Sequence, residues 1–127
     1  MSADFSEDHN AMHDGAARFA ADVFGPANLR ALRDTADGCD RQALSQTIKN
    51  GWLSILVAEE LGGAGQDVIA AAIVCQAFGA ELSNIPAASS MAALAAVAQV
   101  PHWHKHRAFT DSIAGKAVIL PALAGLN

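Results

Sequence analysis

Residues 50–65 read Asn-Gly-Trp-Leu-Ser-Ile-Leu-Val-Ala-Glu-Glu-Leu-Gly-Gly-Ala-Gly. The stretch predicts the end of a helix, a short extended or turn-like buried run, two carboxylates and a glycine-rich turn. Gly51 suits the position just after a helix, because glycine adopts the left-handed backbone conformation found there at little cost. Asp67 is the expected N-cap of the following helix. The stretch therefore joins two helices through a compact turn.

Helical patterns extend on both sides of this turn. Ser6 and Asp40 are expected N-caps, and apolar residues recur at three- and four-residue spacing after each of them. Residues 27–38 are ambiguous between a short helix and an irregular loop. We predict an all-α fold, an up-and-down helical bundle of about five to six helices. The expected helices cover residues 6–24, 40–50, 68–82, 86–99 and 101–113.

A different pattern follows Gly115. Residues 118–123 read Val-Ile-Leu-Pro-Ala-Leu, which is typical of the beginning of a β-strand. The chain offers this strand no partner, and a lone strand cannot satisfy its backbone polar groups. We therefore expect a C-terminal orphan strand, which other residues outside this sequence or a partner chain would complete.

Composition and charge exclude several classes of protein. The 127 residues suit a single domain, and a content of 52% hydrophobic and 17% charged residues is that of a globular protein. The net charge is −5 without a basic stripe, which argues against nucleic-acid and anionic-membrane partners. The most apolar segment, residues 85–100, is shorter than the roughly 20 residues of a bilayer span.

The cysteines and the N-terminal residues indicate the cellular compartment of the protein. Cys39 and Cys75 lie outside any CxxC motif, which favours free thiols in a reducing environment. The first eight residues lack the basic and apolar regions of a signal peptide. We expect a cytoplasmic protein.

The glycine-rich turn is a candidate phosphate site with a simpler interpretation. Residues 62–65 lack the Gly-Lys-Ser/Thr ending of a P-loop, and they do not complete a GxGxxG fingerprint. We interpret them as a tight turn.

Glu59 and Glu60 are adjacent, so their side chains point in different directions and do not form a facing acid–base pair. We interpret both as solvated or capping residues.

The histidines suggest metal ligands only by their spacing. On one helix His102 and His106 would share a face, and His9 and His13 repeat this spacing. A metal site needs further ligands and supporting hydrogen bonds, which nothing in the sequence provides. We predict exposed histidines and no metal site, and a metal-responsive helical protein stays open as an alternative.

No catalytic residue is predicted. Ser89 and Ser90 lie in an alanine-rich helix without a GxSxG elbow, and Cys75 lies in an apolar helical stretch where thiols are usually inert. The small residues between 87 and 96 favour close helix packing, with room for a ligand as the alternative.

Several of these motifs occur in a known order. Gly-Trp at 51–52, Glu-Glu-Leu-Gly-Gly-Ala-Gly at 59–65 and Phe-Gly at 78–79 closely resemble the signature of the N-terminal helical domain of acyl-CoA dehydrogenases. Family members usually have proline before the first glutamate, where this chain has Ala58. The similarity is strongest over residues 49–80 and looser elsewhere.

The resemblance implies a domain organisation and an activity. Residues 1–114 would be the family's N-terminal helical domain, and residues 115–127 would start a β-domain that is otherwise absent. The family uses FAD to desaturate acyl-CoA thioesters between the α and β carbons. The resemblance therefore implies part of a flavoprotein oxidoreductase of fatty acid metabolism, whose catalytic base and most flavin contacts lie in the family's other domains.

The resemblance also implies partners and one set of site residues. FAD is not expected to bind this chain alone, and the flavin-binding residues are unknown. A family helix at this place forms a wall of the acyl pocket, which assigns substrate binding to Ser89, Ser90, Met91 and Leu94. Family members usually form dimers or tetramers, so we expect a homo-oligomer or a partner chain that supplies the missing domains. The alternative is a non-catalytic helical interaction module completed by a partner chain.

Overall fold

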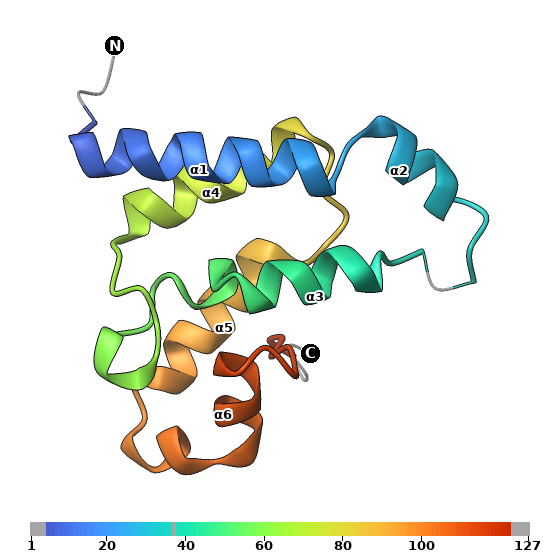
Figure 1. Ribbon diagram of the computed structural model, residues 1–127. Coiled ribbons are helices and arrows are strands. Elements are labelled where there is room, and N and C mark those ends of the chain that lie inside the picture. Colours follow the sequence, from blue (N-terminus) through green and yellow to red (C-terminus); the bar gives the residue numbers. More distant parts are fainter. Residues whose placement is uncertain (1–4, 37, 123–127) are drawn as a thin grey trace, which may run out of the picture. The chain divides into compact units, whose positions relative to one another are not determined.

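A computed structural model describes residues 5–36 and 38–122. Within these ranges the chain forms α-helices and short 3-10 helices without any strand, which confirms the predicted all-α fold (Figure 1). The α-helices are α1 (Glu7–Val23), α2 (Pro26–Leu32), α3 (Arg41–Lys49), α4 (Val68–Ala80), α5 (Ala87–Ala98) and α6 (Arg107–Ile113). The 3-10 helices are η1 (Trp52–Ser54), η2 (Glu59–Leu61) and η3 (Pro101–Lys105).

The chain divides into two compact units. The first unit contains the residues up to Leu44 and the segment Asp67–Ile85. The second unit contains Ser45–Gln66 and the residues from Pro86 onward. In the described part of the chain, no helix is both long enough and apolar enough to span a bilayer.

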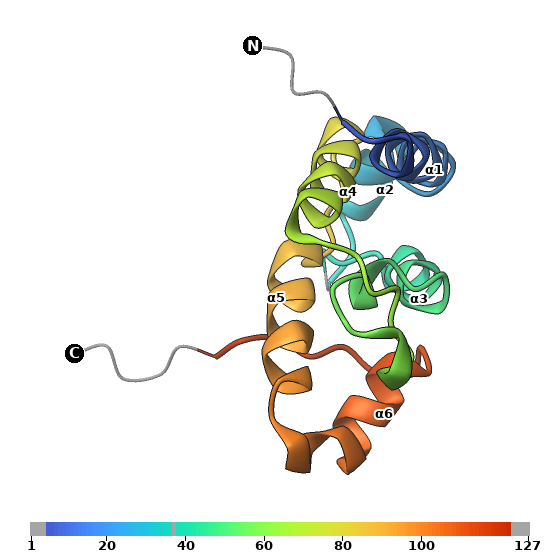
Figure 2. The same ribbon diagram turned by 90° about the vertical axis from the view of Figure 1, so that its left-hand side faces the viewer.

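In the first unit, α1 packs against α4. Figure 2 looks nearly along α1 and shows α4 beside it. Ala16 and Ala20 of α1 are completely buried, as are Ala70 and Val74 of α4. Because most of these side chains are small, the two helix backbones can approach closely. The predicted N-cap is confirmed, since the Ser6 hydroxyl accepts a hydrogen bond from the His9 amide at 3.2 Å.

The ambiguous segment between α1 and α3 is part helix and part loop. α2 begins with Pro26 in its first turn, where the missing amide hydrogen costs nothing. The Asn28 side-chain amide donates to Asp40 Oδ2 at 2.5 Å. Asp40 Oδ1 accepts from the Ala43 amide at 2.9 Å, which confirms its predicted role at the start of α3. One carboxylate therefore holds both ends of this segment.

The second unit has its own apolar core. The buried residues Val57, Leu94, Ala98 and Phe109 form one cluster. They come from the turn after η1, from α5 and from α6, so the cluster joins these three elements. Partly buried side chains that pack against the cluster are Leu61, Val97, Ile113 and Ile119.

One expectation for the C-terminal third is wrong, and another is not shown. The predicted helix over residues 101–113 is broken at His106, whose ψ of 138° is extended; η3 ends before it and α6 begins after it. Residues 117–122 form no strand, and none of them makes a backbone–backbone hydrogen bond within the described residues. Ile119 instead packs against the apolar core of the second unit. Leu123, at the end of the predicted strand, lies outside the described residues.

Candidate functional site

In the glycine-rich turn of the second unit, the backbone amide hydrogens form hydrogen bonds within the turn and the run before it. Each residue from Gly62 to Gln66 donates its backbone N–H to a carbonyl of residues 54–59. A phosphate at this turn would find no free amide, so the interpretation as a tight turn agrees with the geometry. For the donors from Gly62 to Gln66 in turn, the acceptors are the carbonyls of Glu59, Ala58, Ser54, Val57 and Ile55, at N···O distances of 2.9, 3.1, 3.2, 2.8 and 2.9 Å.

Two of the glycines are required by close packing. A Cβ on Gly63 would lie 2.1 Å from the Val57 carbonyl oxygen. A Cβ on Gly62 would lie 2.6 Å from Ile113 Cγ2, and the φ of Gly62 is +93°, in the left-handed region. The turn is thus packed against both the preceding run and α6. Close packing therefore explains why both positions are glycine.

A polar hollow of about 420 Å³ lies beside this turn. Its acidic residues, Glu59 and Glu60, are both exposed, as the sequence indicated. The carboxylates face solvent, and nothing buried converges on them, so the hollow lacks the environment that prepares a carboxyl for acid–base catalysis. Its lining residues are Leu56, Ala58, Glu59, Glu60, Gly65, Gln66 and Gln99.

A second hollow, of about 310 Å³, contains an imidazole. The His104 ring stacks at a tilt on Phe109, with 5.8 Å between ring centroids, and its Nε2 hydrogen-bonds to the Ala98 carbonyl. Because a carbonyl only accepts, Nε2 carries the proton in this bond. The Thr110 hydroxyl likewise donates to the Arg107 carbonyl at 3.0 Å. The imidazole and the hydroxyl group of this hollow are therefore engaged with the backbone. Its lining residues are Glu60, Leu61, His104, Phe109, Thr110, Ile113 and Ala114.

The predicted acyl-pocket residues occupy two kinds of position on α5. Ser90, Met91 and Leu94 are buried, and Leu94 belongs to the core cluster of the second unit. Ser89 is exposed. None of the four lines the hollows described in this section. Their assignment to substrate binding stays a prediction.

Of the two histidine pairs, only His9 and His13 lie on one helix. The expectation that His102 and His106 share a helix face is wrong, because the chain is extended at His106. His9 Nε2 instead lies 3.2 Å from the carboxylate of Asp67. The residues that the structure describes contain no group of three His, Cys, Asp or Glu side chains placed to hold a metal ion.

Neither Cys39 nor Cys75 forms a disulfide. Burial raises the pKa of the Cys75 thiol, which lowers the fraction of reactive thiolate. This fits the inert thiol that the apolar surroundings in α4 predicted.

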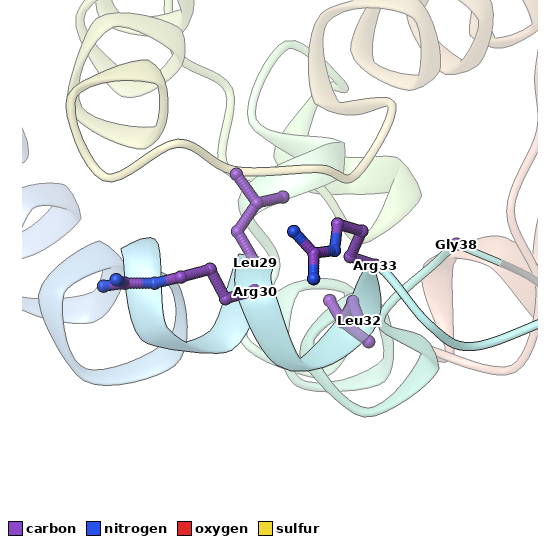
Figure 3. A pocket seen from close by; sticks show the side chains of 5 residues that line it. All are labelled: Leu29, Arg30, Leu32, Arg33 and Gly38. Carbon is purple, nitrogen blue, oxygen red and sulfur yellow. The ribbon is translucent and has the colours of Figure 1, made fainter.

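A third hollow lies in the first unit, along α2, and sequence reasoning missed it. It measures about 310 Å³ and is lined by Leu29, Arg30, Leu32, Arg33 and Gly38. In the view of Figure 3 the Arg33 guanidinium lies between the side chains of Leu29 and Leu32, while Arg30 extends the other way. The only sequence signal was the repeat of Leu-Arg at a spacing of three residues, within a segment whose conformation was ambiguous.

Comparison with protein families shows the family to which the chain belongs. Residues 6–110 match the family described as acyl-CoA dehydrogenase, N-terminal domain. No curated protein matches the chain. The family match spans all the helices from α1 to η3, the glycine-rich turn and the first residues of α6. The chain therefore belongs to the acyl-CoA dehydrogenase family, within which it corresponds to the N-terminal domain.

Proposed function

We propose that this chain serves as the N-terminal helical domain of a flavoprotein oxidoreductase that desaturates acyl-CoA thioesters with FAD. The family match over residues 6–110 carries the proposal. The closely packed glycine-rich turn adds support, because it gives the signature motif a structural role within the domain. In the proposed enzyme the chain contributes part of the substrate pocket and does not catalyse the reaction alone.

The described residues do not fit FAD by themselves. The amide hydrogens of the glycine-rich turn, which would suit a pyrophosphate, are all donated to carbonyls of the same unit. The hollows beside it are of about 420 and 310 Å³, at the low end of the roughly 300–1,000 Å³ usual for ligand pockets. The flavin of the proposed enzyme would therefore be held by residues outside the described part of this chain.

The proposal divides the chain near residue 114. Residues 1–114 would be the helical domain, and residues 115–127 would enter a β-domain supplied by other residues. α6 ends at Ile113, and Gly115 has a φ of +80° with its amide bonded to the Ser112 carbonyl. This ends the helix sharply and supports a boundary at this place.

Within the domain, α5 would form one wall of the acyl pocket. Ser89, Ser90, Met91 and Leu94 are the residues we assign to it. Ser89 is the exposed member of the set, so it is the residue that a ligand could contact without any rearrangement of this chain.

The proposal is tested with the protein as its own cells make it. A tag added at the genomic locus allows the polypeptide and everything bound to it to be purified together. We expect flavin absorbance in the visible range that bleaches when an acyl-CoA is added, together with a soluble cytoplasmic fraction of a homo-oligomer or a two-chain complex. Purified material that contains no flavin and leaves short, medium and long acyl-CoA thioesters unchanged would refute the proposal.

One observation favours a second candidate function, a non-catalytic helical module completed by a partner chain. Within the described residues, the backbone of residues 117–122 makes no backbone–backbone hydrogen bond, and Leu120 is 49% exposed. Such a segment can add to the edge of another protein's sheet. In the same purification, a partner in fixed ratio without any flavin would support this function over the first.

A further inference from the structure

We propose that the hollow along α2 binds a small amphiphile with a single carboxylate, anchored by Arg33 and held against Leu29 and Leu32. The site lies outside the α5 wall and the glycine-rich turn, so it goes beyond the proposed function. All five residues that line it belong to the first unit of the chain.

The lining combines an apolar surface with guanidinium groups. Leu29 and Leu32 are three residues apart on α2 and so lie on neighbouring parts of one helix face. Leu29 is 39% exposed, although leucine side chains usually lie in a core. The volume of about 310 Å³ is at the low end for ligand pockets, which suits a single alkyl chain of medium length and excludes a whole coenzyme.

The charge of the hollow is opposite to that of the protein. The chain carries a net charge of −5, yet two of the five lining residues are arginines and none is acidic. Arg33 Nε lies 3.6 Å from Asp34 Oδ1, and both side chains are more than three-quarters exposed, so this ion pair is weak. The lining itself therefore offers an anion two guanidinium groups and no carboxylate.

The two arginines have different roles. In Figure 3 the Arg33 guanidinium lies between the two leucines, where its planar fork can hold a carboxylate next to an alkyl chain. Arg30 extends away from this point, and its Nε donates to the Pro26 carbonyl at 3.2 Å. Arg33 is therefore the anchor, and Arg30 adds a more distant attraction.

The surrounding loop is held in place by hydrogen bonds. The Asn84 side-chain amide donates to the Gly38 carbonyl at 3.1 Å, and the Asn28 side-chain amide donates to Asp40 at 2.5 Å. The first contact ties Gly38, which lines the hollow, to the segment after α4, and the second ties Asp40 to α2. A preformed site loses less conformational entropy when it binds a ligand.

The test uses octanoate below its micellar concentration with the complete chain. Amide chemical-shift changes in nuclear magnetic resonance spectra should concentrate on residues 29–33 and Gly38, and calorimetry should give a saturable affinity. Arg33→Gln should weaken binding by about tenfold, because it removes a charge-assisted bidentate contact. Arg30→Gln should weaken it less. Arg18→Gln is the matched control on exposed α1 surface, and it should leave the affinity unchanged.

A variant that gains affinity separates binding from damage to the fold. Asp34→Asn removes the carboxylate that competes for Arg33, so octanoate should bind several-fold more tightly. Octanol and octylammonium, which lack the negative charge, should bind at least about tenfold more weakly than octanoate. Equal binding of octanol, tighter binding of octyl phosphate, shifts spread over other surfaces, or an unchanged affinity in Arg33→Gln would each overturn the proposal.

Discussion

His9 Nε2 lies 3.2 Å from both carboxylate oxygens of Asp67, a residue 58 positions further along the chain. Asp67 Oδ1 also accepts the Ala70 amide hydrogen at 2.8 Å and so caps α4. The His9 side chain is only 16% exposed, whereas that of Asp67 is 57% exposed. One carboxylate therefore both starts α4 and ties it to α1.

This pair predicts an acid-sensitive fold. The hydrogen bond from the Ala70 amide lowers the pKa of Asp67 below its ordinary value of 3.8; partial desolvation opposes the effect, and the hydrogen bond and charge of His9 add to it. A carboxyl with a lowered pKa in the folded state stabilises the fold above its unfolded pKa and loses that contribution as the pH falls through the folded pKa. Asp67→Asn should therefore lower the thermal midpoint at neutral pH, and the difference from the wild type should shrink below pH 3.8.

The control for this prediction separates the cap from the pair. His9→Gln keeps the cap of α4 and removes the imidazole, so its thermal midpoint at neutral pH should lie between those of the wild type and Asp67→Ala, which removes the cap and the pair together. Identical midpoints for all three proteins at neutral pH would contradict the role assigned to this carboxylate.

The glycine-rich turn predicts a sharp contrast between two alanine substitutions. In Gly63→Ala the new methyl would lie 2.1 Å from a backbone oxygen, which cannot move without unfolding the turn, so we expect a loss of at least about 4 kcal/mol in the free energy of unfolding. Gly79→Ala places a methyl where no heavy atom lies within 4 Å, on α4. It should stabilise the fold by up to about 1 kcal/mol, because alanine favours the helix. Urea denaturation measures the free energy of unfolding of both variants. An equal change in the two variants would show that the turn is less closely packed than described.

Local signals in the sequence were sufficient for the helix starts and the turn. Ser6, Asp40 and Asp67 were predicted as caps and act as caps, because a cap depends on a side chain and an amide only three residues away. Gly51 has the left-handed conformation expected of it, with a φ of +80°. This conformation depends only on the place of Gly51 directly after a helix, and the rest of the fold is not needed to predict it.

Features that depend on distant packing were missed. The break at His106 divides a segment whose spacing suited one helix, and it coincides with the burial of Phe109 in the core cluster. The hollow along α2 requires Gly38 to fold back towards the helix, which residues 27–38 alone do not specify. For α5, small residues indicated helix packing or a ligand wall, and the burial of Ser90 and Met91 is compatible with both.

An aromatic cluster in the first unit should carry much of its stability. Phe78 is 2% exposed, and its ring centroid lies 5.3 Å from that of Phe24 and 5.8 Å from that of Phe19. Phe78→Ala should cost about 3–5 kcal/mol in the free energy of unfolding, through lost burial and a cavity. Phe5→Ala is the control, because Phe5 is 46% exposed and should cost less than about 1 kcal/mol. Chemical denaturation followed by circular dichroism compares the two, and a similar loss in both would contradict the cluster.

The assignment of α5 to the acyl pocket predicts a change in substrate preference. Ser89 is exposed in this chain, so Ser89→Phe should change the free energy of unfolding by less than about 0.5 kcal/mol. In the flavoprotein purified with this chain, the added ring would occupy space beside the acyl group. The kcat/KM for long acyl-CoA thioesters should therefore fall more than that for short ones, because only the longer chain needs that space. Ala108→Phe, at an exposed position of α6, adds the same ring elsewhere and should leave the ratio unchanged. If Ser89→Phe leaves the ratio of long- to short-chain kcat/KM unchanged, Ser89 does not contact the substrate and the wall of the pocket lies elsewhere.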